Sequence, residues 1–197
     1  MISTADATLN IVTTPADDEI RITRVFSAPR ELVYKAWTDP KMLVHWFGCA
    51  AFSTISATAD AREGGEWRVL MRSPDGEDFP AFGSYLELSP VERIVMTHHW
   101  EKQVAGVNPA HHATRVTVRL FEENGGTRLE FRQTGLATIA SRDSHIGGWG
   151  DSMVTGLRQV SPLPLVPETG AKARTALASD LKKGVMLGGS DIDIVEV

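Results

Sequence analysis

The first clear pattern along the chain is an alternation of apolar and polar positions followed by helical spacing. Residues 19–27, EIRITRVFS, alternate and are rich in β-branched side chains, which is typical of a β-strand. Pro29 suits the first turn of a helix, and the apolar residues of segment 30–38 recur three or four positions apart. The pattern therefore predicts a strand followed closely by a helix that ends near Thr38.

A second short helix is predicted to begin at once. Asp39 and Pro40 form a pair typical of an N-cap and a first helical position, and the apolar face that follows contains Leu43, Trp46 and Phe47. Isolated helices shorter than about 12 residues are marginally stable in water. Both helices must therefore cover an apolar surface formed by another part of the chain.

Residues 52–133 contain repeated strand-like runs separated by turn signals. The turns are marked by Gly64-Gly65, by SPDG at 73–76 and by Gly125-Gly126. Together with 19–27 these runs predict about seven strands, mostly joined by hairpins and hence antiparallel. A sheet of this size must bury one face.

The hydrophobic period becomes helical again between residues 145 and 160. Trp149, Met153, Leu157 and Val160 lie on one helical stripe, which predicts a final helix facing the core. Prolines at 162, 164 and 167 end it.

These elements predict three parts of the chain. Residues 1–18 form an N-terminal extension, residues 19–160 a single domain, and residues 161–197 a C-terminal extension of unknown structure. The extension contains a helix-like cationic run at 171–184 and a strand-like DIDIVEV at 191–197, although we favour a poorly ordered segment.

Composition excludes several classes of protein. The 197 residues are 42% hydrophobic and 23% charged, as in ordinary soluble domains, and the net charge of −5 disfavours binding to nucleic acid or to an anionic membrane. No signal peptide and no run of about 18 apolar residues is evident, so we expect a cytoplasmic protein. Cys49 is the only cysteine, which excludes an internal disulfide.

The six histidines do not form a convincing metal site. His98 and His99 are neighbours on a predicted strand and point to opposite faces, while His111 and His112 fall in a predicted loop. The acidic residues mostly lie beside arginines in turns and on strand faces, where solvated ion pairs are expected. We therefore predict no metal, no cofactor and no identifiable catalytic group.

Strand alternation selects the residues that could form the wall of an internal cavity. It places Trp67 and Met71 on one face of a strand, and His98 on the same face as Trp100. Each candidate could equally be an ordinary core residue, with Tyr85 and His98 as the polar groups of a binding site. The candidate ligand-binding residues are Trp37, Trp46, Trp67, Met71, Tyr85, His98, Trp100, Phe131, Trp149 and Met153.

Four local motifs resemble those of one family. FSAPRELVYKAWTDPKMLVHWFG (26–48), DAREGGEWRVLMRSPDG (60–76), GSYLELSPVERIVMTHHW (83–100) and GGWGDSMVTGL (147–157) occur in the order expected for the family named for the activator of the heat-shock-protein-90 ATPase, within the START-like or SRPBCC superfamily. The resemblance covers residues 19–160. It implies an α+β helix-grip fold, in which a curved antiparallel sheet wraps around a C-terminal helix and two short helices close one end.

The resemblance implies a function as well as a fold. Helix-grip proteins leave an apolar cavity between sheet and helix, so we expect binding of a small hydrophobic or amphipathic ligand. One alternative is stimulation of the heat-shock-protein-90 ATPase, with a chaperone as partner, and another is an enzyme of the cyclase or aromatase kind. Exposed edge strands also favour a homodimer.

Overall fold

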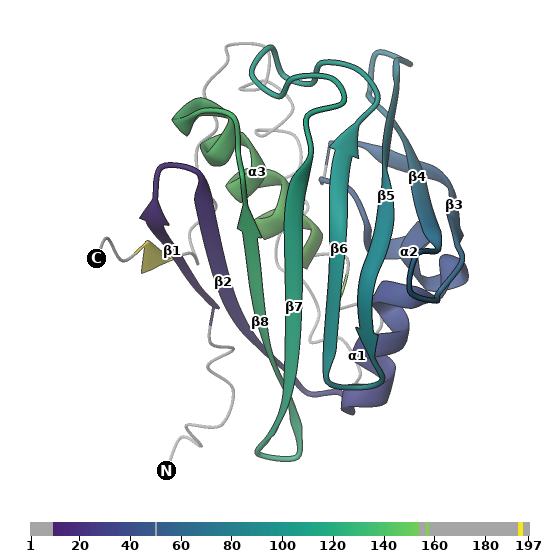
Figure 1. Cartoon of the computed structure of the whole chain (residues 1–197), viewed down its shortest axis with the longest axis vertical. Helices are drawn as coiled ribbons and strands as arrows, with labels where there is room; N and C mark the ends of the chain where they lie inside the picture. Colours follow the sequence, from purple (N-terminus) through teal and green to yellow (C-terminus); the bar gives the residue numbers. More distant parts are fainter. Residues whose placement is uncertain (1–9, 50, 154–156, 158–192, 195–197) are drawn as a thin grey trace, which may run out of the picture.

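The structure is a computed structural model that describes residues 10–49, 51–153, 157 and 193–194 (Figure 1). These described residues form one sheet and three helices. In chain order the elements are β1 (Asn10–Ala16), β2 (Glu19–Phe26), α1 (Arg30–Thr38), α2 (Pro40–Trp46), β3 (Ser53–Ala59), β4 (Glu66–Arg72), β5 (Asp78–Ser89), β6 (Arg93–Trp100), β7 (Thr114–Glu123), β8 (Gly126–Thr134), α3 (Ile139–Asp151) and β9 (Asp193–Ile194).

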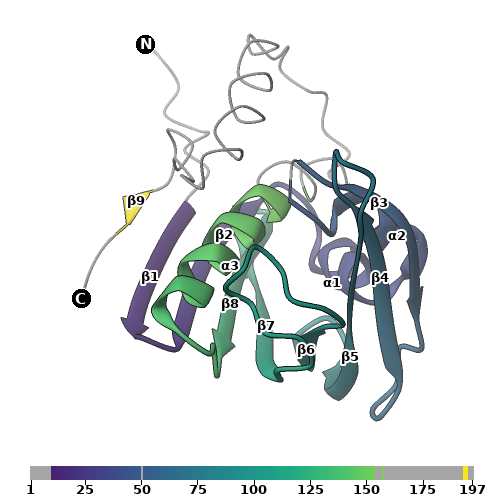
Figure 2. The same ribbon diagram turned by 90° about the horizontal axis from the view of Figure 1, so that it is seen from above.

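The strands form one sheet in the order β3-β4-β5-β6-β7-β8-β2-β1-β9. Neighbouring strands are antiparallel except β1 and β9, which are parallel. The strand predicted at 19–27 corresponds to β2 and returns to pair with β8, where Ile22 lies opposite Phe131. Figure 2 shows that the sheet curves around α3, with α1 and α2 placed toward its other end. The predicted α+β helix-grip fold is thus confirmed.

The two predicted short helices share a single residue as their junction. The main-chain N–H of Asp39 donates to the carbonyl of Lys35, 2.8 Å away, at the end of α1, and the Asp39 carboxylate accepts from the N–H of Lys41, 2.9 Å away, at the start of α2. The indole N–H of Trp46 then donates to the carbonyl of Ala36 at 2.7 Å. The N-cap at Asp39 and the hydrogen bond of the Trp46 indole together hold α2 against α1.

The structure differs from the sequence prediction at the start of the sheet. Strand β1 lies within residues 1–18, the segment assigned to an N-terminal extension, and pairs with β2 along Asn10–Ala16. Val12 of this strand is buried. The stretch NIVTTPA has little alternation and contains Pro15, so the hydrophobic pattern alone does not reveal it.

Helix α3 begins at Ile139, six residues before the predicted start at 145. Thr138 caps it by accepting from the main-chain N–H of Ser141 at 3.0 Å. The early turns bury polar side chains, Ser141 and His145, and a polar stripe does not produce a hydrophobic period. Of the predicted continuation, residues 154–156 and 158–160 lie outside the described residues, as does the helix-like run at 171–184.

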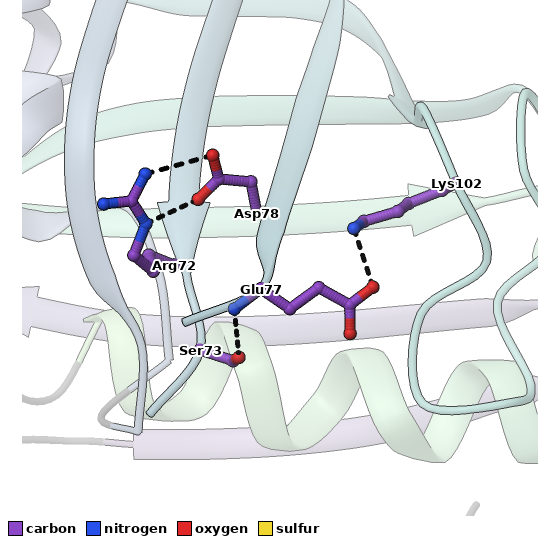
Figure 3. Close-up of polar contacts among 5 residues, drawn as sticks. All are labelled: Arg72, Ser73, Glu77, Asp78 and Lys102. Carbon is purple, nitrogen blue, oxygen red and sulfur yellow. Dashed lines mark hydrogen bonds and ion pairs between the residues drawn. The ribbon is translucent and has the colours of Figure 1, made fainter. Parts of the chain in front are cut away.

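The hairpin between β4 and β5 is held by polar contacts on its solvent side (Figure 3). Arg72 donates two hydrogen bonds to the Asp78 carboxylate, at 2.6 and 3.1 Å. The Ser73 hydroxyl accepts from the main-chain N–H of Glu77 at 3.1 Å, and Lys102 lies 2.8 Å from the Glu77 carboxylate. Because these groups are exposed, they define the geometry of the hairpin more than they stabilise the fold. Among the described residues, no helix is both long enough and apolar enough to cross a bilayer.

Candidate functional site

Six aromatic side chains meet between the concave face of the sheet and the helices. The ring of Trp37 lies 4.6 Å from that of Trp46, 6.2 Å from that of Phe131 and 5.9 Å from that of Trp149, measured between centroids. None of the six is more than 4% exposed. We call this set the aromatic cluster; it comprises Trp37, Trp46, Phe47, Trp67, Phe131 and Trp149.

The other predicted apolar candidates lie in the same interior. Met71 and Met153 are buried, the second with no exposed surface. Tyr85 is fully buried, and its O–H donates to the main-chain carbonyl of Trp37 at 3.0 Å. Burial raises the pKa of the Tyr85 phenol above its usual value. This hydroxyl therefore stays protonated at neutral pH and is engaged with the main chain.

A small polar pocket adjoins the aromatic cluster where α3 passes over β6 and the segment 101–113. Its volume is about 10 Å³, close to the space that one water molecule needs. His98 and Trp100, two of the predicted ligand-binding residues, form part of its wall. The complete lining of this polar pocket is His98, Trp100, Asn108, Pro109, His112, Thr114, Ser141 and His145.

Hydrogen bonds around the polar pocket connect four segments of the chain: β6, residues 101–113, β7 and α3. The Ser141 hydroxyl donates to Asn108 Oδ1 at 2.7 Å, and Asn108 Nδ2 donates to the Ser144 hydroxyl at 3.0 Å. Thr114 Oγ1 donates to the main-chain carbonyl of His98 at 3.0 Å. The segment 101–113 is thereby joined to α3, and the start of β7 to the end of β6.

The hydrogen bonds of His145 determine its protonation. Trp100 Nε1 can only donate, and it lies 3.2 Å from His145 Nε2, so Nε2 carries a lone pair. His145 Nδ1 lies 2.8 Å from the carbonyl of Ser141 and must donate to it. His145 is therefore neutral, with its proton on Nδ1. Burial, more than any other cause, lowers its pKa below the usual value.

His98 is the more enclosed of the two buried histidines in the polar pocket. It is 2% exposed, and its ring lies 5.6 Å from that of His145 and 5.7 Å from that of Trp149. Burial, more than any other cause, lowers the pKa of His98 well below its ordinary value. Both buried histidines of the polar pocket are consequently neutral at pH 7.

One amide connects the polar pocket to the aromatic cluster. Gln133 is fully buried; its Oε1 accepts from the indole N–H of Trp149 at 2.6 Å, and its Nε2 donates to Thr114 Oγ1 at 2.9 Å. Gln133 was not predicted from the sequence, because a polar residue near the end of a strand is usually exposed to solvent. Strand alternation places it on the buried face of β8 with Leu129 and Phe131, and that signal could have found it.

Other polar residues missed by sequence analysis come from less regular segments. Asn108 lies in the connection between β6 and β7, and Ser141 and His145 lie on the early turns of α3. All three are buried. No period in the sequence marks them, because their burial depends on how α3 crosses the sheet.

No carboxylate or thiol of the described part of the chain lines the polar pocket. Glu19 is the buried carboxylate among the described residues; it accepts two hydrogen bonds from Arg132, at 2.7 and 2.9 Å, and these lower its pKa to about 2. Burial raises the pKa of the Cys49 thiol to about 11, so it is not a nucleophile at neutral pH. Asp60 pairs with Arg62 at 2.8 Å on the surface. Across the described residues no group of three or more His, Cys, Asp or Glu side chains could hold a metal ion.

A curved antiparallel sheet that encloses a C-terminal helix over an aromatic interior defines a helix-grip protein, a fold used generally for ligand binding. The family model described as "Activator of Hsp90 ATPase homolog 1-like protein" matches residues 27–161, and the chain belongs to this family. The resemblance inferred from the four motifs is thus confirmed.

Solved structures with the same fold are numerous. A protein from Chromobacterium violaceum, known from a crystal structure, is 28% identical in sequence to this chain. The match covers 75% of this chain and 99% of that protein, with a TM-score of 0.65. A protein from Nitrosomonas europaea is 27% identical over 75% of this chain and 96% of its own, with a TM-score of 0.61. An AHSA1 protein from Silicibacter pomeroyi, 20% identical over 72% of this chain and 95% of its own, has a TM-score of 0.62. No curated protein matches the chain.

Proposed function

We propose that this protein binds a small hydrophobic or amphipathic molecule between the concave face of its sheet and α3. The observation that carries the proposal is the direct connection of the aromatic cluster to the polar pocket through Gln133. Ligand sites are mostly apolar and contain a few polar groups that orient the ligand. A core that served packing alone would not need His98, Asn108 and Gln133 at 2% exposure or less.

The small volume of the polar pocket defines how such a ligand would enter. About 10 Å³ accommodates one water molecule, so a larger molecule requires α3 to move away from the sheet. The polar contacts of α3 with the body of the domain include two that involve Asn108 and one from Trp100 to His145. A few hydrogen bonds worth about 1 kcal/mol each can be exchanged for contacts with a ligand. Ligand binding should therefore be coupled to displacement of α3.

The first test is native mass spectrometry of the purified full chain, followed by denaturation to release any bound molecule. We expect an organic molecule that leaves on unfolding. A thermal-shift screen of neutral aromatic and aliphatic compounds is the second test, because a ligand at 100 times its dissociation constant adds about 2.7 kcal/mol of stability. Absence of a co-purified molecule combined with a flat screen would refute the proposal.

Two threonines on β7 offer a matched pair of variants. Thr114→Val removes a buried hydroxyl from the polar pocket with little change in shape, whereas Thr117→Val makes the same change on the opposite face of the strand. We expect Thr114→Val to weaken binding of compounds with a polar end, and Thr117→Val to leave binding unchanged. Equal effects of both substitutions would place the ligand elsewhere.

The described residues favour binding over catalysis. The Tyr85 hydroxyl and both ring nitrogens of His145 are engaged within the protein, and Glu19 is paired with arginine. The family description refers to activation of an ATPase, an activity that an ATPase assay with the chaperone measures directly. Stimulation of that ATPase in the absence of any bound small molecule would replace ligand binding as the function.

A further inference from the structure

One of the five tryptophans differs from the others in its hydrogen bonding. Four indole N–H groups donate to an acceptor within the protein. The indole N–H of Trp37 has no acceptor among the described residues, although the side chain is only 1% exposed. The four paired tryptophans are Trp46, Trp67, Trp100 and Trp149.

An unpaired N–H in the interior is unfavourable, because the group loses its hydrogen bonds to water and gains none in return. The side chain of Trp37 is surrounded by the rings of Trp46, Phe131 and Trp149, which offer no strong acceptor to it. Its own main-chain carbonyl is occupied by the O–H of Tyr85. Unsatisfied buried donors are rare in folded proteins and call for a partner outside the chain.

We propose that Trp37 donates its indole N–H to an uncharged oxygen acceptor, a carbonyl or hydroxyl group, of a ligand held in the aromatic cluster. This inference rests on the proposed function and narrows the ligand class. The aromatic neighbours of Trp37 are neutral, and placing an anion against them would require costly desolvation. The ligand is therefore an apolar molecule with a neutral oxygen, and Trp37 is the residue that orients it.

Three probes of nearly the same shape test this choice: cumene, acetophenone and benzoate carry an isopropyl, an acetyl and a carboxylate group on the same phenyl ring. In a purely apolar site cumene binds best, since it is the least soluble in water. A hydrogen bond from Trp37 favours acetophenone instead. Binding of each probe to the full chain is measured by isothermal titration calorimetry and by thermal shift.

The substitution that isolates the donor is Trp37→Phe, which keeps an aromatic ring and removes the N–H. We expect the affinity for acetophenone relative to cumene to fall about tenfold, the effect of one neutral hydrogen bond. Trp46→Phe is the comparison, because the N–H that it removes is already bonded to Ala36. It should change both affinities together and leave their ratio as in the wild type.

A second measurement does not depend on a variant that binds ligand. In protein labelled with ¹⁵N-tryptophan, five indole N–H signals are expected, and Trp37→Phe identifies one of them by its loss. Acetophenone should move the Trp37 proton signal downfield relative to its position with cumene, since both probes carry the same ring. The four paired indoles serve as internal controls.

The outcomes separate this inference from the function on which it rests. If cumene and acetophenone bind with the same ratio in wild type and Trp37→Phe, the role of Trp37 is wrong and ligand binding stands. If benzoate binds most tightly, the ligand is anionic and the inference fails. A Trp37 signal that exchanges with water and ignores acetophenone also overturns it. If no probe and no screened compound binds, both proposals fail.

Discussion

Acidification should destabilise this protein in a pH range that reports the two buried histidines. His98 and His145 have folded-state pKa values below the ordinary 6.5, mainly because both are buried. Between 6.5 and the folded-state values the unfolded chain binds more protons than the folded chain, so unfolding becomes easier as pH falls. Their contribution to stability is complete above pH 6.5 and is lost progressively below it.

The size of the effect follows from the protonation of the unfolded chain. At pH 5.5, one unit below 6.5, a histidine that is still neutral in the folded state lowers the free energy of unfolding by about 1.4 kcal/mol. The two histidines together give about 2.8 kcal/mol as an upper limit. Glu19, with a folded-state pKa of about 2 against 4.5, contributes only at lower pH and does not interfere.

The assay is urea denaturation at pH 7.5, 6.5 and 5.5, followed by tryptophan fluorescence. His145→Gln should reduce the pH dependence, because only His98 then remains. His45→Gln, at an exposed position on α2, is the control and should behave as the wild type. A free energy of unfolding that stays constant within about 0.5 kcal/mol from pH 7.5 to 5.5 would show that the buried histidines are not held neutral.

Four further substitutions test the interactions that hold the fold together. Glu19→Gln should lower the free energy of unfolding by about 1–2 kcal/mol at pH 7, because Arg132 loses a charged partner. Denaturant titrations should show this loss shrinking as pH falls from 4.5 toward 2, and a loss that is independent of pH would contradict the argument. Gly83→Ala should prevent stable folding, because the new Cβ would lie 1.9 Å from a main-chain oxygen of β6. Gly148→Ala should stabilise α3 by up to about 1 kcal/mol, because its new Cβ would meet no atom within 4 Å outside the backbone of the helix itself. Thermal melts should show a loss of stability for the first variant and a gain for the second. Tyr85→Phe should lose about 1 kcal/mol for one hydrogen bond to the main chain, and an unchanged melting temperature would argue against that bond.

Patterns in the sequence predicted the elements that carry strong periodicity. The pair Asp39-Pro40 defined the junction of α1 and α2, and alternation along β4 placed Trp67 and Met71 in the interior, where the structure has them. β1 was missed because it lies toward the edge of the sheet and contributes one fully buried apolar side chain, Val12, with no regular alternation. Its place depends on pairing with β2 more than on its own sequence.

Most of the apolar half of the candidate site was predicted, but little of its polar half. Tryptophan and phenylalanine side chains carry a large apolar surface that favours burial, so the residues of the aromatic cluster could be predicted from the sequence. Of the polar pocket only His98 and Trp100 were predicted, because its other side chains come from the segment 101–113, from the start of β7 and from α3. Asn108 and Ser141 are 33 positions apart and become partners only when the helix docks.

The shared residue between α1 and α2 limits how this end of the domain can deform. Asp39 ends one helix and begins the next, so no intervening segment is available to absorb a change in the angle between them. The two helices must therefore tilt together as one unit. Because α1 carries Trp37 and α2 carries Trp46, widening the interior from this side would displace both indoles together.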